Sequence, residues 1–207
     1  MPVPQTSRRT QAERTAETRA RILRAVVESI AEVGFQRTTA SEITRRAGVS
    51  WGAVQHHFGG KDGILSAVLE DSFDRFAALL ADVPRGEAPL EKRVGLFVDR
   101  AWAHFSSPDY HSTFEILLSY LPEESGSAEA GAAILQGEMF EAWNRVWSEI
   151  FSDVRLPRRR VAALQTFTIS ALSGMASLAM LQRAVETLQG DELALLKRTL
   201  LGEMGRA

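Results

Sequence analysis

The side chains best suited to binding a charged polymer lie close together in the N-terminal third of the chain. Thr38 and Thr39 carry hydroxyls next to a predicted helix start, where a hydroxyl and free backbone amides together hold a phosphate oxygen. Ser50, at the next helix start, is a further candidate DNA-binding residue. Lys61 adds a positive charge at a later helix start, and the amide of Gln55 matches the N6 and N7 edge of adenine. Phosphate donors provide position and base-edge groups provide selection, so these residues predict contacts with DNA.

The elements that must position these groups are two short helices and the turn between them. Thr39 and Glu42 have the spacing of a capping box, in which Thr39 accepts from an amide of the first turn and Glu42 reaches back to the amide of Thr39. Gly48 suits the left-handed residue that ends this helix. Ser50 then caps a further helix from Trp51 to His57. Two short helices joined by a tight turn containing glycine form a helix-turn-helix, whose second helix enters the major groove.

The second helix of this pair carries Trp51, Gly52, Gln55, His56 and His57. Gly52 removes a side chain where the helix start approaches DNA. Trp51 either packs on a thymine methyl group or a sugar, or covers apolar surface. His56 and His57 are adjacent and point about a hundred degrees apart on a helix, so they do not form a chelate. We therefore expect no metal site and no cofactor.

A motif of fixed spacing covers some thirty residues and reads Gly34-Phe35-x-x-Thr38-Thr39-x-x-x-Ile43-x-x-x-Ala47-Gly48-Val49-Ser50-x-Gly52-x-x-x-x-His57-Phe58-x-x-Lys61-x-x-Ile64-Leu65. It resembles the N-terminal DNA-binding signature of TetR-family transcriptional regulators. The resemblance implies a contact of His57 with the DNA backbone. Two positions depart from the family pattern, which commonly has tyrosine at the place of Gln55 and a small, basic or polar residue at that of Trp51. These departures predict a preferred DNA site particular to this protein.

Composition limits the remaining possibilities. The chain has 207 residues, 45% of them hydrophobic, and no cysteine. We find no signal-peptide pattern at the start and no uninterrupted apolar run of the roughly eighteen residues that a membrane span needs. We therefore expect a cytoplasmic protein without a membrane partner. The Gly-x-Ser-x-Gly, Walker-type, His-Glu-x-x-His and Gly-x-Gly-x-x-Gly motifs are absent from the sequence, so we do not expect an enzyme.

The formal charge of −2 conceals an asymmetry. Residues 1–61 hold ten Lys or Arg against five Asp or Glu, a charge of +5, and the rest hold fourteen against 21, a charge of −7. A basic N-terminal segment on an acidic remainder is expected where one end of a protein meets phosphates.

Helical periodicity extends through the whole chain, without a candidate strand, so the predicted fold is all-α. We expect a flexible basic arm over residues 1–16, either a solvated tail or an additional DNA contact. A three-helix helix-turn-helix domain follows over residues 17–62, and a helical effector-binding and dimerisation domain over residues 63–207. The predicted helices outside the helix-turn-helix pair are 18–33, 61–81, 89–105, 108–120, 128–151, 158–189 and 192–203, with a loop over 123–126 and a break at Gly190-Asp191.

The helix predicted from Arg158 is apolar or small nearly all round in its central part, so it must be buried on more than one side. It is either central to its own subunit or part of a dimer seam, and two-fold oligomers are the commonest kind. Resemblance to the TetR family implies that the last two helices of each subunit form a four-helix bundle. We therefore expect a homodimer through residues 158–203.

The resemblance also implies a ligand pocket in the C-terminal domain. The candidate lining residues are mostly aromatic or aliphatic: Trp102, Phe105, His111, Phe114, Leu118, Trp143, Trp147, Phe167 and Met175. Aromatic residues at helical spacing are also typical of plain core, and His111 with Glu115 also fits a solvated surface pair. The lining favours a small hydrophobic or flat aromatic effector. We expect the protein to be a repressor that binds an inverted-repeat operator and that this effector releases from it. The alternative is a constitutive or architectural DNA-binding protein without an effector.

Overall fold

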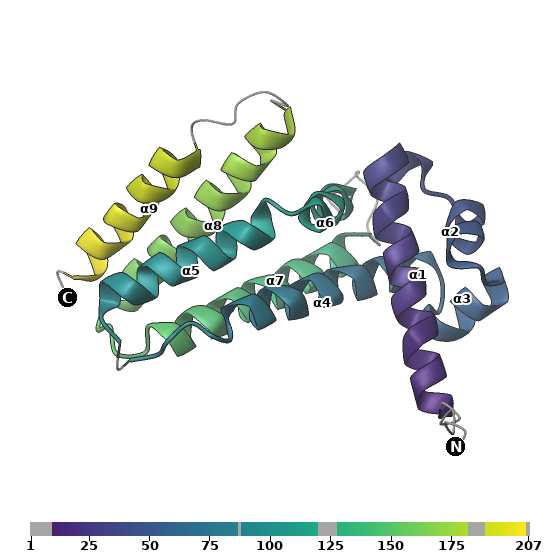
Figure 1. Ribbon diagram of the computed structural model, residues 1–207, viewed down its shortest axis with the longest axis horizontal. Helices are drawn as coiled ribbons and strands as arrows, with labels where there is room; N and C mark the ends of the chain where they lie inside the picture. Colours follow the sequence, from purple (N-terminus) through teal and green to yellow (C-terminus); the bar gives the residue numbers. More distant parts are fainter. Residues whose placement is uncertain (1–9, 87, 120–127, 182–188, 206–207) are drawn as a thin grey trace, which may run out of the picture. The chain divides into compact units, whose positions relative to one another are not determined.

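The computed structural model describes residues 10–86, 88–119, 128–181 and 189–205, which form helices joined by turns, with no strand among them (Figure 1). The predicted all-α class is therefore confirmed. The chain divides into two compact units, Met1–Leu69 and Glu70–Ala207. We call them unit 1 and unit 2 and describe each by itself. Helix α4 (Lys61–Leu80) begins in unit 1 and ends in unit 2.

Unit 1 consists of α1 (Gln11–Val33), the 3-10 turn η1 (Phe35–Arg37), α2 (Ala40–Ala47), α3 (Trp51–Phe58) and the first part of α4. Its core is aliphatic and takes residues from each α-helix. The fully or almost fully buried members include Ile22, Val26, Ile30, Ile43, Val54, Ile64, Val68 and Leu69. Helices as short as α2 and α3 are marginal alone, so their packing in this core, α2 against α1 and α3 against α2, holds them in place.

Helix α1 begins at Gln11, several residues before the predicted start at about Thr18. The Thr10 hydroxyl accepts from the Glu13 amide at 3.2 Å, and the Glu13 carboxylate accepts from the Thr10 amide at 2.6 Å, which is a complete capping box. Residues 11–16 therefore extend the helix and are not part of a flexible arm. The prediction missed them because it used apolar periodicity, which these polar residues do not show. The remainder of the predicted arm, residues 1–9, lies outside the described residues.

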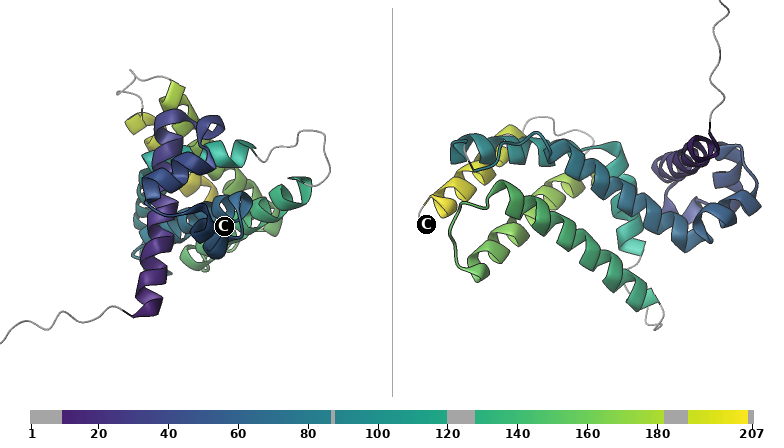
Figure 2. Two further views of the ribbon diagram at one scale, coloured as in Figure 1. Left: turned by 90° about the vertical axis from the view of Figure 1, so that its right-hand side faces the viewer. Right: turned by 90° about the horizontal axis from the view of Figure 1, so that it is seen from below.

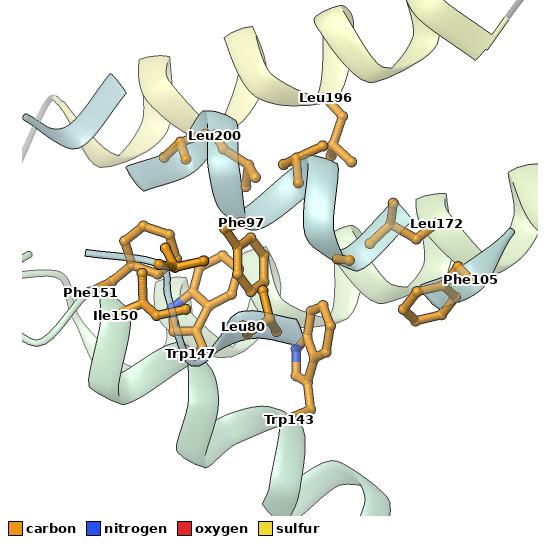
Figure 3. Close-up of a cluster of buried hydrophobic side chains, with 14 of the residues drawn as sticks. Leu80, Phe97, Phe105, Trp143, Trp147, Ile150, Phe151, Leu172, Leu196 and Leu200 are labelled. Carbon is orange, nitrogen blue, oxygen red and sulfur yellow. The ribbon is translucent and has the colours of Figure 1, made fainter. Parts of the chain in front are cut away.

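Unit 2 contains the end of α4 together with α5 (Leu90–Phe105), α6 (Pro108–Ser119), α7 (Ala128–Ile150), α8 (Arg158–Leu181) and α9 (Gln189–Met204). Helix α5 packs on α6, α8 and α9 (Figures 1 and 2). Aromatic rings fill much of the core (Figure 3). The ring of Phe97 lies 5.4–5.5 Å from those of Trp143, Trp147 and Phe151.

The predicted break at Gly190-Asp191 is wrong, because both residues lie inside α9. Asp191 and Glu192 occupy its first turn, where negative charge is favoured by the helix dipole. The predicted continuation of the preceding helix over residues 182–188 lies outside the described residues. The same holds for the predicted loop over 123–126.

Helix α8 includes the one segment, among the residues that the structure describes, that is long and apolar enough by length and composition to cross a membrane. This segment is Arg158–Met180, and its mean hydropathy reaches 1.4 over an 18-residue stretch. A core helix of a soluble protein can have the same length and composition, and Leu172 and Ala176 are fully buried in unit 2. Only 28% of that 18-residue stretch is buried, however. Much of α8 thus presents apolar or small residues outside the core of its own unit.

Candidate functional site

Helix α3 is held by caps at both ends. At its start the Ser50 hydroxyl accepts from the Ala53 amide at 3.2 Å, and the preceding Gly48 is left-handed, with φ of 61°. At its end, the backbone amide of Gly59 donates to the Gln55 carbonyl at 2.8 Å. Buried Val54 fixes the inner face of the helix. The side that remains outward is therefore defined by packing.

The outward side of α3 carries the residues predicted to contact DNA. Gly52, Gln55 and His56 are exposed, and Trp51 and His57 are half-buried. Trp51 at the helix start and Gln55 one turn later share a face, as the four-residue spacing requires. An amide and an aromatic ring on one helical face combine hydrogen bonding to base edges with apolar contact.

Thr39 and Ser50 are exposed at the starts of α2 and α3. Each hydroxyl accepts a capping hydrogen bond, Thr39 from the Glu42 amide at 3.2 Å. A hydroxyl that accepts in this way keeps its own proton for a phosphate oxygen. Both residues therefore combine a cap with a free donor on the surface.

The predicted contact of Thr38 with a DNA phosphate does not fit the structure and is corrected. Its side chain is only 5% exposed. The hydroxyl lies 3.0 Å from the Gly34 carbonyl, to which it donates, and 3.1 Å from the Ser29 hydroxyl, and the amide donates to the Phe35 carbonyl at 3.1 Å. These bonds occupy both donors inside unit 1. Thr38 joins the end of α1 to the start of α2 instead of reaching a phosphate.

The predicted capping box at Thr39 forms only in part. The Glu42 carboxylate is used by two guanidinium groups, those of Arg45 and Arg46, and Arg46 also donates to Glu32 on α1 at 2.6 Å. Hydrogen bonds from Arg45, followed by those from Arg46, lower the pKa of Glu42 to about 2. This network ties α2 to α1, and it was missed because it needs residues from two helices.

Two basic residues are placed against aromatic rings of unit 1. Lys61 is exposed, and its Nζ lies 5.2 Å from the Phe35 ring centroid. Arg19 of α1 donates to the His57 carbonyl at 2.6 Å and lies 4.4 Å above the Phe58 ring. Arg19 thereby holds the end of α3 and is a positioning residue that sequence patterns did not indicate. Lys61 remains available to a phosphate.

Unit 2 contains a cavity of about 120 Å³ bounded by α4, α5, α6, α7 and α8. Most of its lining is aromatic, with a few hydroxyl groups. The lining residues are Ser72, Phe73, Phe76, His104, Phe105, Tyr110, Thr113, Phe114, Leu117, Ala142, Trp143, Ile169 and Ser173.

Three of the predicted pocket residues, Phe105, Phe114 and Trp143, line this cavity. The other six do not: Trp102, His111, Leu118, Trp147, Phe167 and Met175. Leu118 and Phe167 are about half exposed, and Trp147 packs in the aromatic core against Phe97 and Phe151. Apolar periodicity identifies the buried face of a helix but does not distinguish core from cavity wall. The small and polar lining residues gave no such signal.

The polar groups around the cavity differ in their partners. The hydroxyls of Tyr110 and Ser173 are 3.0 Å apart and form a hydrogen bond. The Ser72 hydroxyl and the Trp143 indole nitrogen are buried and have no hydrogen-bond partner. Burial, helped by the charge of Arg75, lowers the pKa of His104 to about 4, so its imidazole is neutral at pH 7.

Comparison with known proteins agrees with this arrangement. Residues 22–68 match the model of the family "Bacterial regulatory proteins, tetR family". An uncharacterized HTH-type transcriptional regulator of Mycobacterium tuberculosis (strain ATCC 25618 / H37Rv) is 37% identical over 95 residues, which are 44% of this chain and 49% of that protein. The HTH-type transcriptional regulator BetI of Escherichia coli O45:K1 is 35% identical over 108 residues, 45% of this chain and 55% of that one.

These matches span about half the length of the relatives. The crystal structure of the multidrug binding protein EbrR complexed with imidazole extends the likeness to the fold, with a TM-score of 0.63 over 95% of this chain and 96% of that chain, at 18% identity. The fold is thus shared with that solved protein, whereas the two sequence matches cover 44% and 45% of this chain.

Proposed function

This chain belongs to the TetR family of bacterial regulatory proteins, and from that premise we propose that it is a repressor released from its operator by a small effector. Regulators of this family bind DNA operators and small-molecule effectors. The observation that carries the proposal is the pairing, in one chain, of an outward α3 face with an apolar cavity in unit 2. We further propose that the protein is cytoplasmic and has no enzymatic activity.

In the proposed DNA complex, α3 enters the major groove. Gln55 reads a base edge, and Trp51 packs on a thymine methyl group or a sugar. Phosphate contacts come from Thr39, Ser50, His57 and Lys61, and Gly52 and His56 lie at the same surface. The full or partial exposure of these groups and the capping of both helix starts support this division between reading and positioning.

A homodimer is the assembly that best suits residues 158–203. Apolar residues on this part of the surface include Phe167, Leu178 and Leu195, each about half exposed in the single chain. Small residues such as Ala171 and Gly174 permit close approach of a second helix. Contiguous apolar surface on a soluble protein commonly marks an interface. In the proposed dimer, the partner subunit, and not lipid, covers the exposed apolar side of α8, which explains the membrane-like composition of this helix.

Helix α4 provides the proposed route of release. Lys61, at its first position, belongs to the DNA-contacting set, and Ser72, Phe73 and Phe76 on the same helix line the cavity. A ligand that prefers one position of α4 changes the spacing of the two reading helices of a dimer. DNA and ligand then weaken each other's binding by the same factor, typically about 5–150-fold.

The proposal is tested by selecting duplexes from a random library with the purified full-length protein. We expect enrichment of an inverted repeat whose half-site centres lie about 34–36 Å apart, or a multiple of that spacing. Footprinting should show symmetric protection, and sedimentation should show a dimer. A monomer that protects one asymmetric half-site would refute the dimeric proposal. The constitutive alternative is favoured if no ligand alters the affinity for the selected duplex.

Two substitutions should separate positioning from reading. Lys61→Ala should weaken binding to all duplexes alike and lower the slope of log affinity against log salt by about one unit, because one phosphate contact is lost. Gln55→Ala should instead flatten the preference at one position of each half-site, by roughly 1–3 kcal/mol. Repeating the selection with both variants checks this assignment. A changed base preference in Lys61→Ala, or an unchanged one in Gln55→Ala, would reverse the roles.

A further inference from the structure

We infer that the cavity of unit 2 takes an uncharged ligand about the size of one aromatic ring, carrying a hydroxyl or similar polar group that meets Ser72 or Trp143. This inference rests on the proposal that the chain is a ligand-responsive regulator, and it narrows the ligand to a chemical class, neutral phenols and their like. Size, lining, unpartnered polar groups and charge each contribute to it.

The volume sets the scale of the ligand. The cavity measures about 120 Å³. An engineered protein cavity of about 150 Å³ lined by apolar side chains stays dry and binds benzene. A molecule with one ring and one or two small substituents therefore fits inside the cavity, whereas a fused polycyclic ligand would extend beyond it.

The walls favour an aromatic ring. Phe76 meets Phe105 edge-on, with centroids 6.3 Å apart, and Phe105 lies 4.6 Å from Tyr110. Tyr110 in turn stacks against Phe114 at 6.0 Å. A further ring among these four continues the edge-to-face and offset geometries that aromatic groups prefer.

Two unpartnered polar groups point to a hydroxyl on that ring. Buried polar atoms in folded proteins are nearly always hydrogen-bonded, and each exception requires an explanation. Ser72 and Trp143 both line the cavity, yet the Ser72 hydroxyl and the Trp143 indole nitrogen are buried without partners. Figure 3 shows the Trp143 ring, with its nitrogen, inside the buried cluster. The indole N–H can only donate, whereas a ligand hydroxyl can accept from it or bond with Ser72.

Charge excludes ionic ligands. None of the residues that line the cavity in the described part of the chain is Asp, Glu, Lys or Arg. Nearby Arg75 is engaged by two carboxylates, Asp71 at 2.9 Å and Asp109 at 3.3 Å. His104 is neutral at pH 7, because burial lowers its pKa to about 4. An anion or cation would lose its hydration here without gaining a counter-charge.

Calorimetry at pH 7 on the full-length protein without DNA tests the inference with three probes of one ring size. They are p-cresol, toluene, which lacks the hydroxyl, and benzoate, which is charged. We expect p-cresol to bind at least tenfold more tightly than either of the others. If toluene binds as tightly as p-cresol, the inference that the ligand carries a hydroxyl is overturned. If benzoate binds more tightly than p-cresol, the inference that the ligand is uncharged is overturned. Absence of binding by all three would overturn the whole inference.

Two conservative variants identify the polar partner. Trp143→Phe keeps a ring but removes the N–H, and Ser72→Ala removes the hydroxyl. We expect at least one of them to weaken p-cresol binding fivefold or more while toluene affinity stays within twofold, which also reports an intact cavity. Equal p-cresol affinity in both variants and the wild type would overturn the role of these groups. The calorimetry contains no DNA, so it tests the ligand class alone. If p-cresol binds but leaves the affinity for the operator unchanged in a separate measurement, the proposed release by ligand is refuted and the ligand class is not.

Discussion

Replacing Asp153 with alanine should lower the free energy of unfolding by about 3 kcal/mol, the lower end of the range for breaking a buried ion pair. The Arg93 side chain is 3% exposed, and its guanidinium donates to both carboxylate oxygens of Asp153 at 2.6 and 2.7 Å. Without Asp153 that buried charge keeps its hydrogen bonds to two backbone carbonyls, those of Ala88 and Ile150, and a contact with the Phe151 ring at 5.9 Å. The lower end applies because Asp153 itself is 43% exposed, so water replaces part of the lost contact.

An exposed pair in the same unit provides the control. Arg100 and Asp82 are 2.7 Å apart, with side chains 44% and 62% exposed. Asp82→Ala should therefore cost less than about 1 kcal/mol. Urea unfolding of both variants at pH 7 makes the comparison. Equal losses would contradict the buried role of Arg93, which joins the start of α5 to the end of α7.

The second large effect concerns pH. His104 is buried beside Phe76, Phe105 and Tyr110, and burial lowers its pKa from 6.5 to about 4. In the unfolded chain the imidazole takes up a proton below about pH 6.5, whereas in the folded chain it does so only near pH 4. The unfolded state thus binds more protons throughout this window, so stability falls as the pH decreases from 6.5 to 4.

The expected size is about 3 kcal/mol between pH 7 and pH 4, because one pKa unit corresponds to about 1.4 kcal/mol. His104→Gln, which does not titrate, should lack this part of the loss. The difference between the two proteins isolates His104 from groups common to both, including the neighbouring Arg75 and Asp109. Denaturant unfolding at half-unit pH steps measures it. Parallel curves for wild type and variant would contradict the neutral, buried state of this imidazole.

Local sequence patterns predicted the parts of the fold that depend on neighbouring residues. Gly48 ends α2 in a left-handed conformation and Ser50 caps α3, as the spacing of these residues requires. The three-four repeat of apolar residues likewise identified the helices of unit 2. Such features follow from contacts within one or two helical turns.

Features that depend on distant residues were not predictable. Thr38 has the sequence position of a phosphate donor. Its hydroxyl instead hydrogen-bonds to Ser29 in α1 and to Gly34 at the end of that helix. Arg19 meets the His57 carbonyl across 38 residues, and Arg93 meets Asp153 across 60. The residues that line the cavity were equally hard to predict from the sequence, because they depend on which helices approach each other and on where their side chains leave space.

The central claim, sequence-specific DNA binding by the outward face of α3, is tested most directly by one comparison of affinities. Fluorescence anisotropy at physiological salt should be measured for the selected duplex and for a scrambled duplex of the same length and composition. The account predicts that the selected duplex binds at least about 10³-fold more tightly, the lower limit for specific recognition. Equal affinities for the two duplexes would contradict it and would leave only non-specific attraction between the basic segment and phosphates.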